Sequence, residues 1–170
     1  MTFYYINEVI GTVLKDILTK KCSEKYHNKL NNIAVTWINY EVSSKKGYGY
    51  GINNSKKMYP ASVVKIVYAL AIFYWIENKT ILRDEQVNEA IEQMLQNSSN
   101  DATSYIVDLL TGTTSGPSLE EEIFNRWKYQ RGIINDWLKN LNWEELKDFN
   151  CCQKTWEDGP YGREKDFYDH

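Results

Sequence analysis

The sequence predicts an α/β (α+β) fold in which helices pack on an antiparallel sheet. Three observations support this prediction: an amphipathic N-terminal segment, two β-branched and aromatic runs joined by a turn, and a long uncharged run after them. This order of a helix, a hairpin and a buried helix is typical of helices that cover an antiparallel sheet. With 170 residues, 42% of them hydrophobic, the chain is long enough for a single domain spanning 1–170 with its own core.

The N-terminal part predicts a helix followed by a hairpin. Residues 3–21 carry apolar side chains at helical spacing. Residues 33–42 are rich in β-branched and aromatic residues and predict a strand. A polar turn at 43–47 leads to a returning strand over 48–52, which contains two glycines. The two strands are therefore expected to pair antiparallel.

The longest apolar run, Ile66 to Ile76, carries no charge and follows directly after Lys65. A run of this kind predicts a helix that is buried nearly all round. A lysine at its head requires an explanation, because an unpaired buried ammonium is costly. Ser62 precedes Lys65 by three residues, a spacing that on a helix brings both side chains to one face. A desolvated lysine has a lowered pKa and can take a proton from a serine.

The rest of the chain predicts three further helices and a loop. Residues 83–96 form the first, with Val87, Ile91, Met94 and Leu95 expected to point inward. A polar cluster rich in N-cap residues, 96–101, opens the second over 102–110. The third begins at Ser118 and extends to about Leu141. Helical spacing then fades, so a closing loop without a helix or strand is expected over 151–170.

Composition restricts the classes of function. A net charge of −3 and a pI near 5.5 give no support for a nucleic-acid partner. Three cysteines, Cys22, Cys151 and Cys152, have no zinc-like spacing, and their odd number argues against a disulfide framework, so no metal and no cofactor is predicted. We expect no signal peptide and no membrane span, so the sequence as written is that of a cytoplasmic chain, and the compartment of the intact protein stays open.

Two motifs in order carry a resemblance. Residues 59–65 read Tyr-Pro-Ala-Ser-Val-Val-Lys, and residues 98–103 read Ser-Ser-Asn-Asp-Ala-Thr. A Ser-x-x-Lys at the head of a buried helix, followed by a Ser-x-Asn at the head of a later one, resembles the class A β-lactamase and penicillin-binding-protein serine hydrolases. The resemblance covers the chain from residue 33 onward. It implies a β-lactamase/transpeptidase-like fold, with a helical domain and an incomplete antiparallel sheet.

The resemblance also implies roles for four residues. Ser62 matches the nucleophile that is acylated by a β-lactam or a peptide-like amide, and its backbone N–H matches half of an oxyanion hole. Lys65 matches the amine that deprotonates this serine. Ser98 matches the hydroxyl that relays a proton to the leaving nitrogen, and Asn100 matches the amide that holds Lys65 and binds the substrate. From the residues alone, a capping serine and a solvent-reaching lysine remain the alternative for each motif.

Class A enzymes also use a glutamate that activates water for deacylation. In this chain the matching stretch is 155–164. Glu164 is preferred because Arg163 beside it resembles the arginine–glutamate neighbourhood of the family's loop. Glu157 is the alternative, and an ordinary loop carboxylate is the simpler interpretation of Glu164.

The chain departs from the family in its third motif. A Lys-Thr-Gly on a later edge strand is not found, and Lys154-Thr155-Trp156 is rejected because it precedes the glutamate. The sequence therefore resembles a domain without its last strands. Three alternatives follow: an inactive truncated remnant, a non-catalytic domain that self-associates through an unpaired sheet edge, or an acyl-enzyme former similar to a D-alanyl-D-alanine peptidase.

Overall fold

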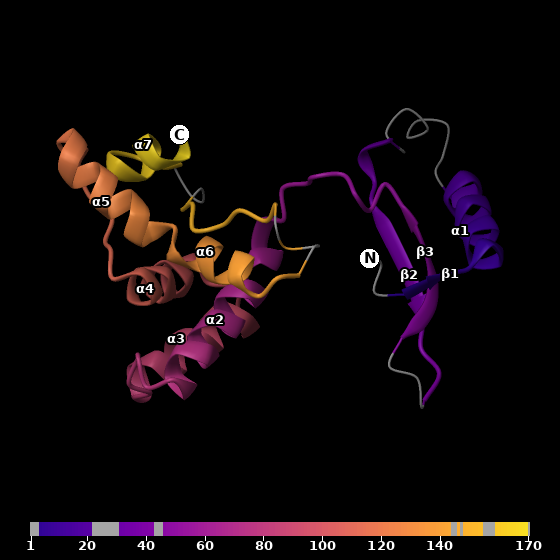
Figure 1. The fold of residues 1–170 in the computed structure, drawn as a ribbon, viewed down its shortest axis with the longest axis horizontal. Helices are drawn as coiled ribbons and strands as arrows, with labels where there is room; N and C mark the ends of the chain where they lie inside the picture. The colour runs from indigo at the N-terminus through magenta and orange to yellow at the C-terminus, as the bar shows by residue number, and fades with distance from the viewer. Residues whose placement is uncertain are drawn as a thin grey trace. The chain divides into compact units, whose positions relative to one another are not determined.

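In its described residues, the computed structural model contains seven α-helices and a small three-stranded sheet, a mixed α/β architecture (Figure 1). The chain is divided into two compact units, an N-terminal unit over 1–59 and a helical unit over 60–170. The single catalytic domain over 1–170 stays a prediction. The structure describes residues 4–21, 31–42, 46–143, 146, 148–154 and 159–169.

The sheet of the N-terminal unit has the strand order β1-β3-β2. Strands β2 (Val35–Asn39) and β3 (Gly47–Ile52) pair antiparallel, which confirms the predicted hairpin. Strand β1 (Tyr4–Ile6) pairs parallel to β3. The expectation of a purely antiparallel sheet is therefore wrong, and the sheet is mixed.

The strand β1 occupies the start of the segment that was predicted to be helical. Helix α1 runs only from Glu8 to Lys21. Asn7 explains the boundary: its side-chain oxygen accepts the N–H groups of Val9 and Ile10 at 3.0 and 3.2 Å. Its own N–H donates to Gly49 O at 2.8 Å and so extends the strand pairing. An N-cap of this kind fixes the start of a helix more sharply than apolar spacing does.

The helical unit is built around α2, α3 and α4. A 3₁₀ turn, η2 (Ala61–Val64), leads into α2 (Lys65–Glu77). Helices α3 (Glu85–Gln96) and α4 (Asn100–Thr111) confirm the two predicted helices within two residues at each end. Asp84 caps α3 by accepting the N–H of Val87 at 2.8 Å. The core that these helices share with a later helix includes fully buried side chains: Tyr68, Ile72, Met94, Ile106, Val107 and Ile134.

Helix α2 is buried on one side only, so the expectation of burial nearly all round is wrong. Tyr68 and Ile72 are buried, whereas Ile66 and Leu70 on the opposite side are each 58% exposed. Within the helical unit, α3 and α4 cover only the first of these sides. Leu95 of α3, which was expected to point inward, is also exposed. Met94 points into the core, and the next residue lies about 100° further round the helix, so Leu95 faces away from the core.

The segment predicted as one helix up to Leu141 forms two helices, α5 (Glu121–Arg131) and α6 (Ile133–Asn140). Gly132 separates them: its N–H bonds Lys128 O, and its carbonyl accepts the N–H of Asn135. Glycine is a poor helix former, so the chain changes direction there at low cost.

A short helix, α7 (Arg163–Tyr168), replaces part of the predicted closing loop. Gly162 precedes it with a φ of 53°. A Cβ atom at Gly162 would lie 2.1 Å from Gly116 O, so only glycine fits where these two backbones meet. This close contact and the packing of Phe167 on Trp127 hold α7 to α5.

Candidate functional site

Ser62 lies on the η2 turn, directly before α2. The backbone N–H of Lys65 donates to Ser62 O, so the two residues are one turn apart. The Ser62 side chain is exposed, which leaves its hydroxyl accessible. Ala61 before it has a φ of 46°, a left-handed conformation that is unfavourable for an alanine. Strain of this kind is concentrated at functional sites in proteins.

Lys65 is 4% exposed and directs its ammonium toward the start of α4. Its Nζ atom lies 2.5 Å from Ser98 O, 3.0 Å from Ser98 Oγ and 3.0 Å from Asn100 Oδ1. The structure therefore brings together three of the predicted residues, Lys65, Ser98 and Asn100.

The cap of α4 is Ser99 and not Ser98. Ser99 Oγ accepts the N–H of Ala102 at 3.2 Å. Ser98 has a φ of 53°, which turns its side chain to Lys65 and away from the capping position. Simple capping consequently explains Ser99 and does not explain the contacts of Ser98 or Asn100.

The surroundings of Lys65 destabilise its charged form relative to that of an exposed lysine. Within the described part of the chain, Lys65 has oxygen partners but no ion pair with a carboxylate. Burial lowers the pKa of Lys65 below its ordinary value. No hydrogen bond joins its Nζ to the side chain of Ser62 in the described residues. The amine and the hydroxyl are thus one turn apart without direct contact in this structure.

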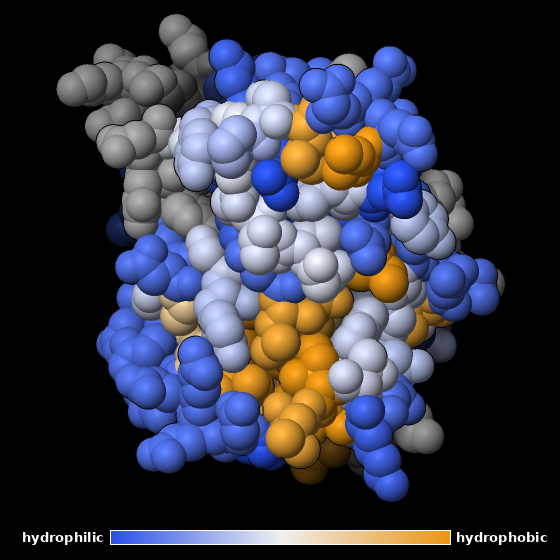
Figure 2. All heavy atoms as spheres, turned by 90° about the vertical axis from the view of Figure 1, so that its left-hand side faces the viewer, coloured by the Kyte–Doolittle hydropathy of each residue, from blue (hydrophilic) through white to orange (hydrophobic). Residues whose placement is uncertain are grey.

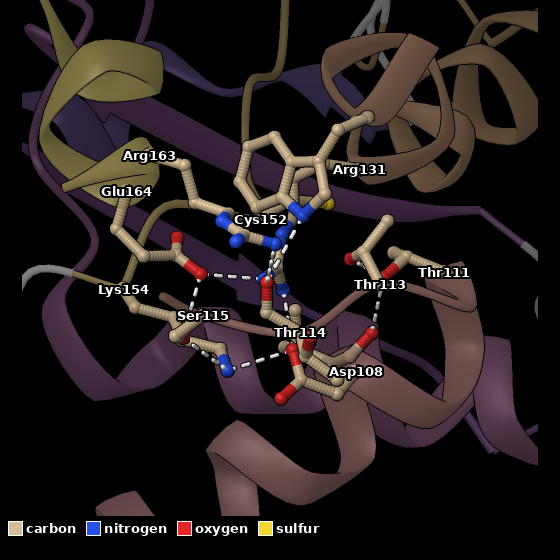
Figure 3. Close-up of polar contacts among 12 residues, drawn as sticks. Asp108, Thr111, Thr113, Thr114, Ser115, Arg131, Cys152, Lys154, Arg163 and Glu164 are labelled. Carbon is tan, nitrogen blue, oxygen red and sulfur yellow. Dashed lines mark hydrogen bonds and ion pairs between the residues drawn. The ribbon is translucent and has the colours of Figure 1, made fainter. Parts of the chain in front are cut away.

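A second cluster of charged residues lies deeper in the helical unit (Figure 3). Arg131 is fully buried and lies 2.5 Å from Glu164 Oε1 and 2.9 Å from Asp108 Oδ1. Lys154 lies 2.7 Å from the same Asp108 oxygen. Ser115 Oγ donates to Glu164 Oε1 at 2.8 Å and accepts from Lys154 Nζ at 3.2 Å. Two cations and two carboxylates therefore balance one another.

This ion cluster joins segments that are distant in the sequence. Asp108 is on α4, Arg131 ends α5, and Glu164 is on α7. Burial lowers the pKa of Lys154, and the bond to Asp108 opposes this effect. One Glu164 oxygen, Oε2, is buried and has no hydrogen-bond partner among the described residues. The arrangement is that of a structural core of charges, in which each ion neutralises another.

Glu164 belongs to this ion cluster and not to the group around Lys65. Asn100 and Asp108 are eight residues apart on α4, which corresponds to about 12 Å along the helix. The two clusters share no residue and no hydrogen bond in the described ranges. Glu164 is also 3% exposed and on a helix, and the expectation of a loop position is wrong. Its role as the residue that activates water stays a prediction.

Other residues of the predicted site fall outside this geometry. Glu157, with Thr155 and Trp156, lies outside the described residues. Lys154 is in an irregular segment, bonded to Asp108 as given above. Sequence reasoning missed Arg131 and Asp108, and local spacing offers no signal for them, because their partners are 23 to 46 residues away.

Comparisons with known proteins do not assign a family to this chain. No family model, no curated protein and no solved structure matches this chain. Among the described residues, no group of His, Cys, Asp or Glu could hold a metal ion. None of the described helices has the length and apolar character to cross a membrane. The functional conclusion therefore depends on the chemistry of the residues around Lys65.

Proposed function

We propose that the chain forms an acyl-enzyme through Ser62, as a serine hydrolase of the class A β-lactamase type that opens β-lactam amides. The observation that carries this proposal is the buried Lys65 amine, which has only neutral oxygen partners in the described residues and lies one turn after an exposed serine. Structural lysines are commonly paired with a carboxylate when they are buried. A lysine with a lowered pKa and neutral partners is suited to accept a proton.

Acylation requires one proton transfer to the enzyme and one to the leaving group. The neutral Lys65 amine accepts the Ser62 hydroxyl proton while the Ser62 oxygen attacks the carbonyl carbon of the amide. The C–N bond of the resulting tetrahedral intermediate then breaks. Ser98 Oγ, 3.0 Å from Lys65 Nζ, passes the proton from Lys65 to the departing nitrogen. The product is an ester on Ser62.

Asn100 has a positioning part in this scheme. Its Oδ1 atom accepts from Lys65 Nζ at 3.0 Å and fixes the direction of the amine. The side-chain NH₂ of the same amide remains as a donor for a carbonyl of the substrate. Hydrolysis of the ester by water releases a carboxylic acid and restores Ser62. A chain in which this last step does not occur is a D-alanyl-D-alanine peptidase-like acyl-enzyme former.

Intact-mass spectrometry with a chromogenic cephalosporin tests the proposal. We expect the native chain to gain the mass of the opened cephalosporin, and Ser62→Ala to gain nothing. Ser118→Ala, which removes another exposed hydroxyl, is the matched control and is expected to gain the same mass as the native chain. Circular dichroism shows that each variant is folded. A folded native chain without any adduct would contradict the proposal, and an adduct that persists would indicate the peptidase-like alternative.

A further inference from the structure

A hollow of about 470 Å³ lies in the helical unit between the end of α2 and helices α5 and α6. This volume falls within the range of small-molecule sites, about 300–1,000 Å³. Its residues come from two parts of the chain, 74–80 and 129–140, and include none of the residues around Lys65. The hollow is therefore separate from the proposed acyl-transfer site.

Aromatic rings form the walls of this hollow. Trp75 and Trp137 pack edge to face with centroids 5.4 Å apart, and Tyr74 lies 5.4 Å from the Trp137 ring. Tyr129 completes the wall and is 73% exposed. An aromatic side chain this exposed leaves its ring face available to a ligand, because the protein itself does not cover it.

The polar residues of the hollow are mostly neutral. Asn78 and Asn140 contribute side-chain amides, and Thr80 contributes a hydroxyl, which together supply donors and acceptors. Asp136 is the only charged residue of this lining, and Lys139 lies 3.6 Å from it. An ionic ligand would therefore find little uncompensated charge. An entirely apolar ligand would cover the amides without bonding them, at a free-energy cost.

A second hollow of about 350 Å³ adjoins the first and shares Tyr129 and Asp136 with it. Three amides line it, Asn135, Asn150 and Gln153, together with Lys128 and with Lys139, which pairs with Asp136. Tyr129 thus lines both hollows, and each of them also offers side-chain amides and at least one further aromatic ring. A ligand made of repeating units can occupy both, with one unit against each side of this ring.

We propose that these two hollows form a binding groove for a neutral oligosaccharide. Sugar rings present an apolar C–H face that packs on aromatic rings and a rim of hydroxyls that pair with amides. The groove offers both kinds of surface: the Tyr74, Trp75, Trp137 and Tyr129 rings, and the amides of both hollows. The shared Tyr129 accounts for the preference for a chain of sugars over a single ring.

NMR titration of the full chain tests this groove. The probes are neutral trisaccharides of glucose, mannose, galactose and N-acetylglucosamine, followed through the tryptophan indole N–H signals. We expect at least one probe to shift the Trp75 and Trp137 signals saturably, with a millimolar dissociation constant. Tyr129→Ala is expected to weaken this binding at least about tenfold, the effect of removing a stacking aromatic residue. Tyr161→Ala, at another exposed tyrosine, is the matched control and is expected to bind as the native chain does.

Two results would overturn the groove. In the first, no probe shifts the Trp75 or Trp137 signals of the folded native chain. In the second, binding occurs with the same affinity in Tyr129→Ala. Because Tyr129 is largely exposed, its truncation is not expected to unfold the chain. Unchanged indole signals elsewhere in the spectrum verify that the variant is folded.

Discussion

Asn100 Oδ1 accepts a hydrogen bond from Lys65 Nζ at 3.0 Å, so a neutral amide and not a carboxylate faces the buried amine. This choice of partner has an electrostatic consequence. A carboxylate at this distance would stabilise the ammonium, whereas an amide leaves most of the cost of desolvation uncompensated. Burial accordingly lowers the pKa of Lys65. The proposed base therefore becomes neutral at a lower pH than an ordinary lysine.

Acylation is expected to follow the titration of Lys65. The fraction of neutral amine increases with pH, so the rate of adduct formation should rise and level off around a pKa below that of an exposed lysine. Asn100→Asp places a negative charge beside Nζ, raises the pKa of Lys65 and moves the whole profile to higher pH. Rapid-quench mass spectrometry over a pH series measures both profiles. Asn97→Asp, at an exposed amide, is the control, and coinciding profiles for native and Asn100→Asp would contradict the role of Lys65.

The left-handed conformation of Ala61 predicts a stabilising substitution. A residue with a Cβ pays about 1–2 kcal/mol in this region, whereas glycine adopts it freely and loses only about 0.5–1 kcal/mol of chain entropy. Ala61→Gly is thus expected to raise the free energy of unfolding slightly, by up to about 1 kcal/mol. Ala90→Gly, inside α3, should lower it by about 1 kcal/mol. Urea denaturation compares the two, and equal losses would show that Ala61 is not strained.

The fully buried Arg131 predicts a large loss of stability on truncation. Arg131→Ala leaves Asp108 and Glu164 with only part of their compensation, and breaking a buried ion pair costs about 3–5 kcal/mol. Arg126→Ala removes an exposed pair with Glu122 on the same helix and should cost less than about 1 kcal/mol. Urea denaturation followed by circular dichroism measures both. Similar small losses would mean that water enters the ion cluster.

Glu164→Gln distinguishes a structural carboxylate from one that activates water. Glu164 is bonded to Arg131 and Ser115, so we expect the variant to lose stability. Glu164 belongs to the ion cluster and not to the group around Lys65. We also expect the decay of any Ser62 adduct to be unchanged from that of the native chain. Glu122→Gln, at an exposed carboxylate, should change neither property. A stable Glu164→Gln chain that retains its adduct would instead support the water-activating role implied by the family resemblance.

The adjacent thiols of Cys151 and Cys152 are expected to be inert in the folded chain. The hydrogen bond with Cys152, whose Sγ lies 3.6 Å away, and burial raise the pKa of Cys151, so it does not form the reactive thiolate at neutral pH. In a Cys22→Ser background, iodoacetamide should label neither thiol in buffer and both in urea. Mass spectrometry counts the labels. Fast labelling in buffer would show that the segment opens.

Exposed apolar side chains of α2 do not by themselves identify a binding face. The molecule carries such side chains in several places, including Leu82 and Tyr161 outside α2. Figure 2 shows a hydrophobic area bordered by hydrophilic residues on one face. The uncharged composition of α2 nevertheless predicts burial nearly all round, which the exposed Ile66 and Leu70 contradict. An uncharged run shows that the helix carries no charged side chain. It does not show which sides of the helix are covered by other elements.

Local patterns determined much of this chain from its sequence alone. β-branched and aromatic runs predicted the hairpin, and apolar spacing predicted α3 and α4. The two motifs, through the family that they resemble, predicted that Lys65, Ser98 and Asn100 lie close together. Each of these features depends on residues that are close in the sequence or that lie at a helix start. The local pattern of side chains is therefore enough to predict it.

Tertiary structure alone decided the rest. Strand β1 forms by pairing with β3, which lies about forty residues later in the chain. The placement of Glu164 follows from its bond to Arg131, 33 residues earlier. The break at Gly132 and the close contact of Gly162 with Gly116 likewise depend on backbones that meet only in the fold. Long-range pairing of charges and strands leaves no periodic pattern in the sequence. It depends on desolvation and close packing of residues that meet only in the folded chain.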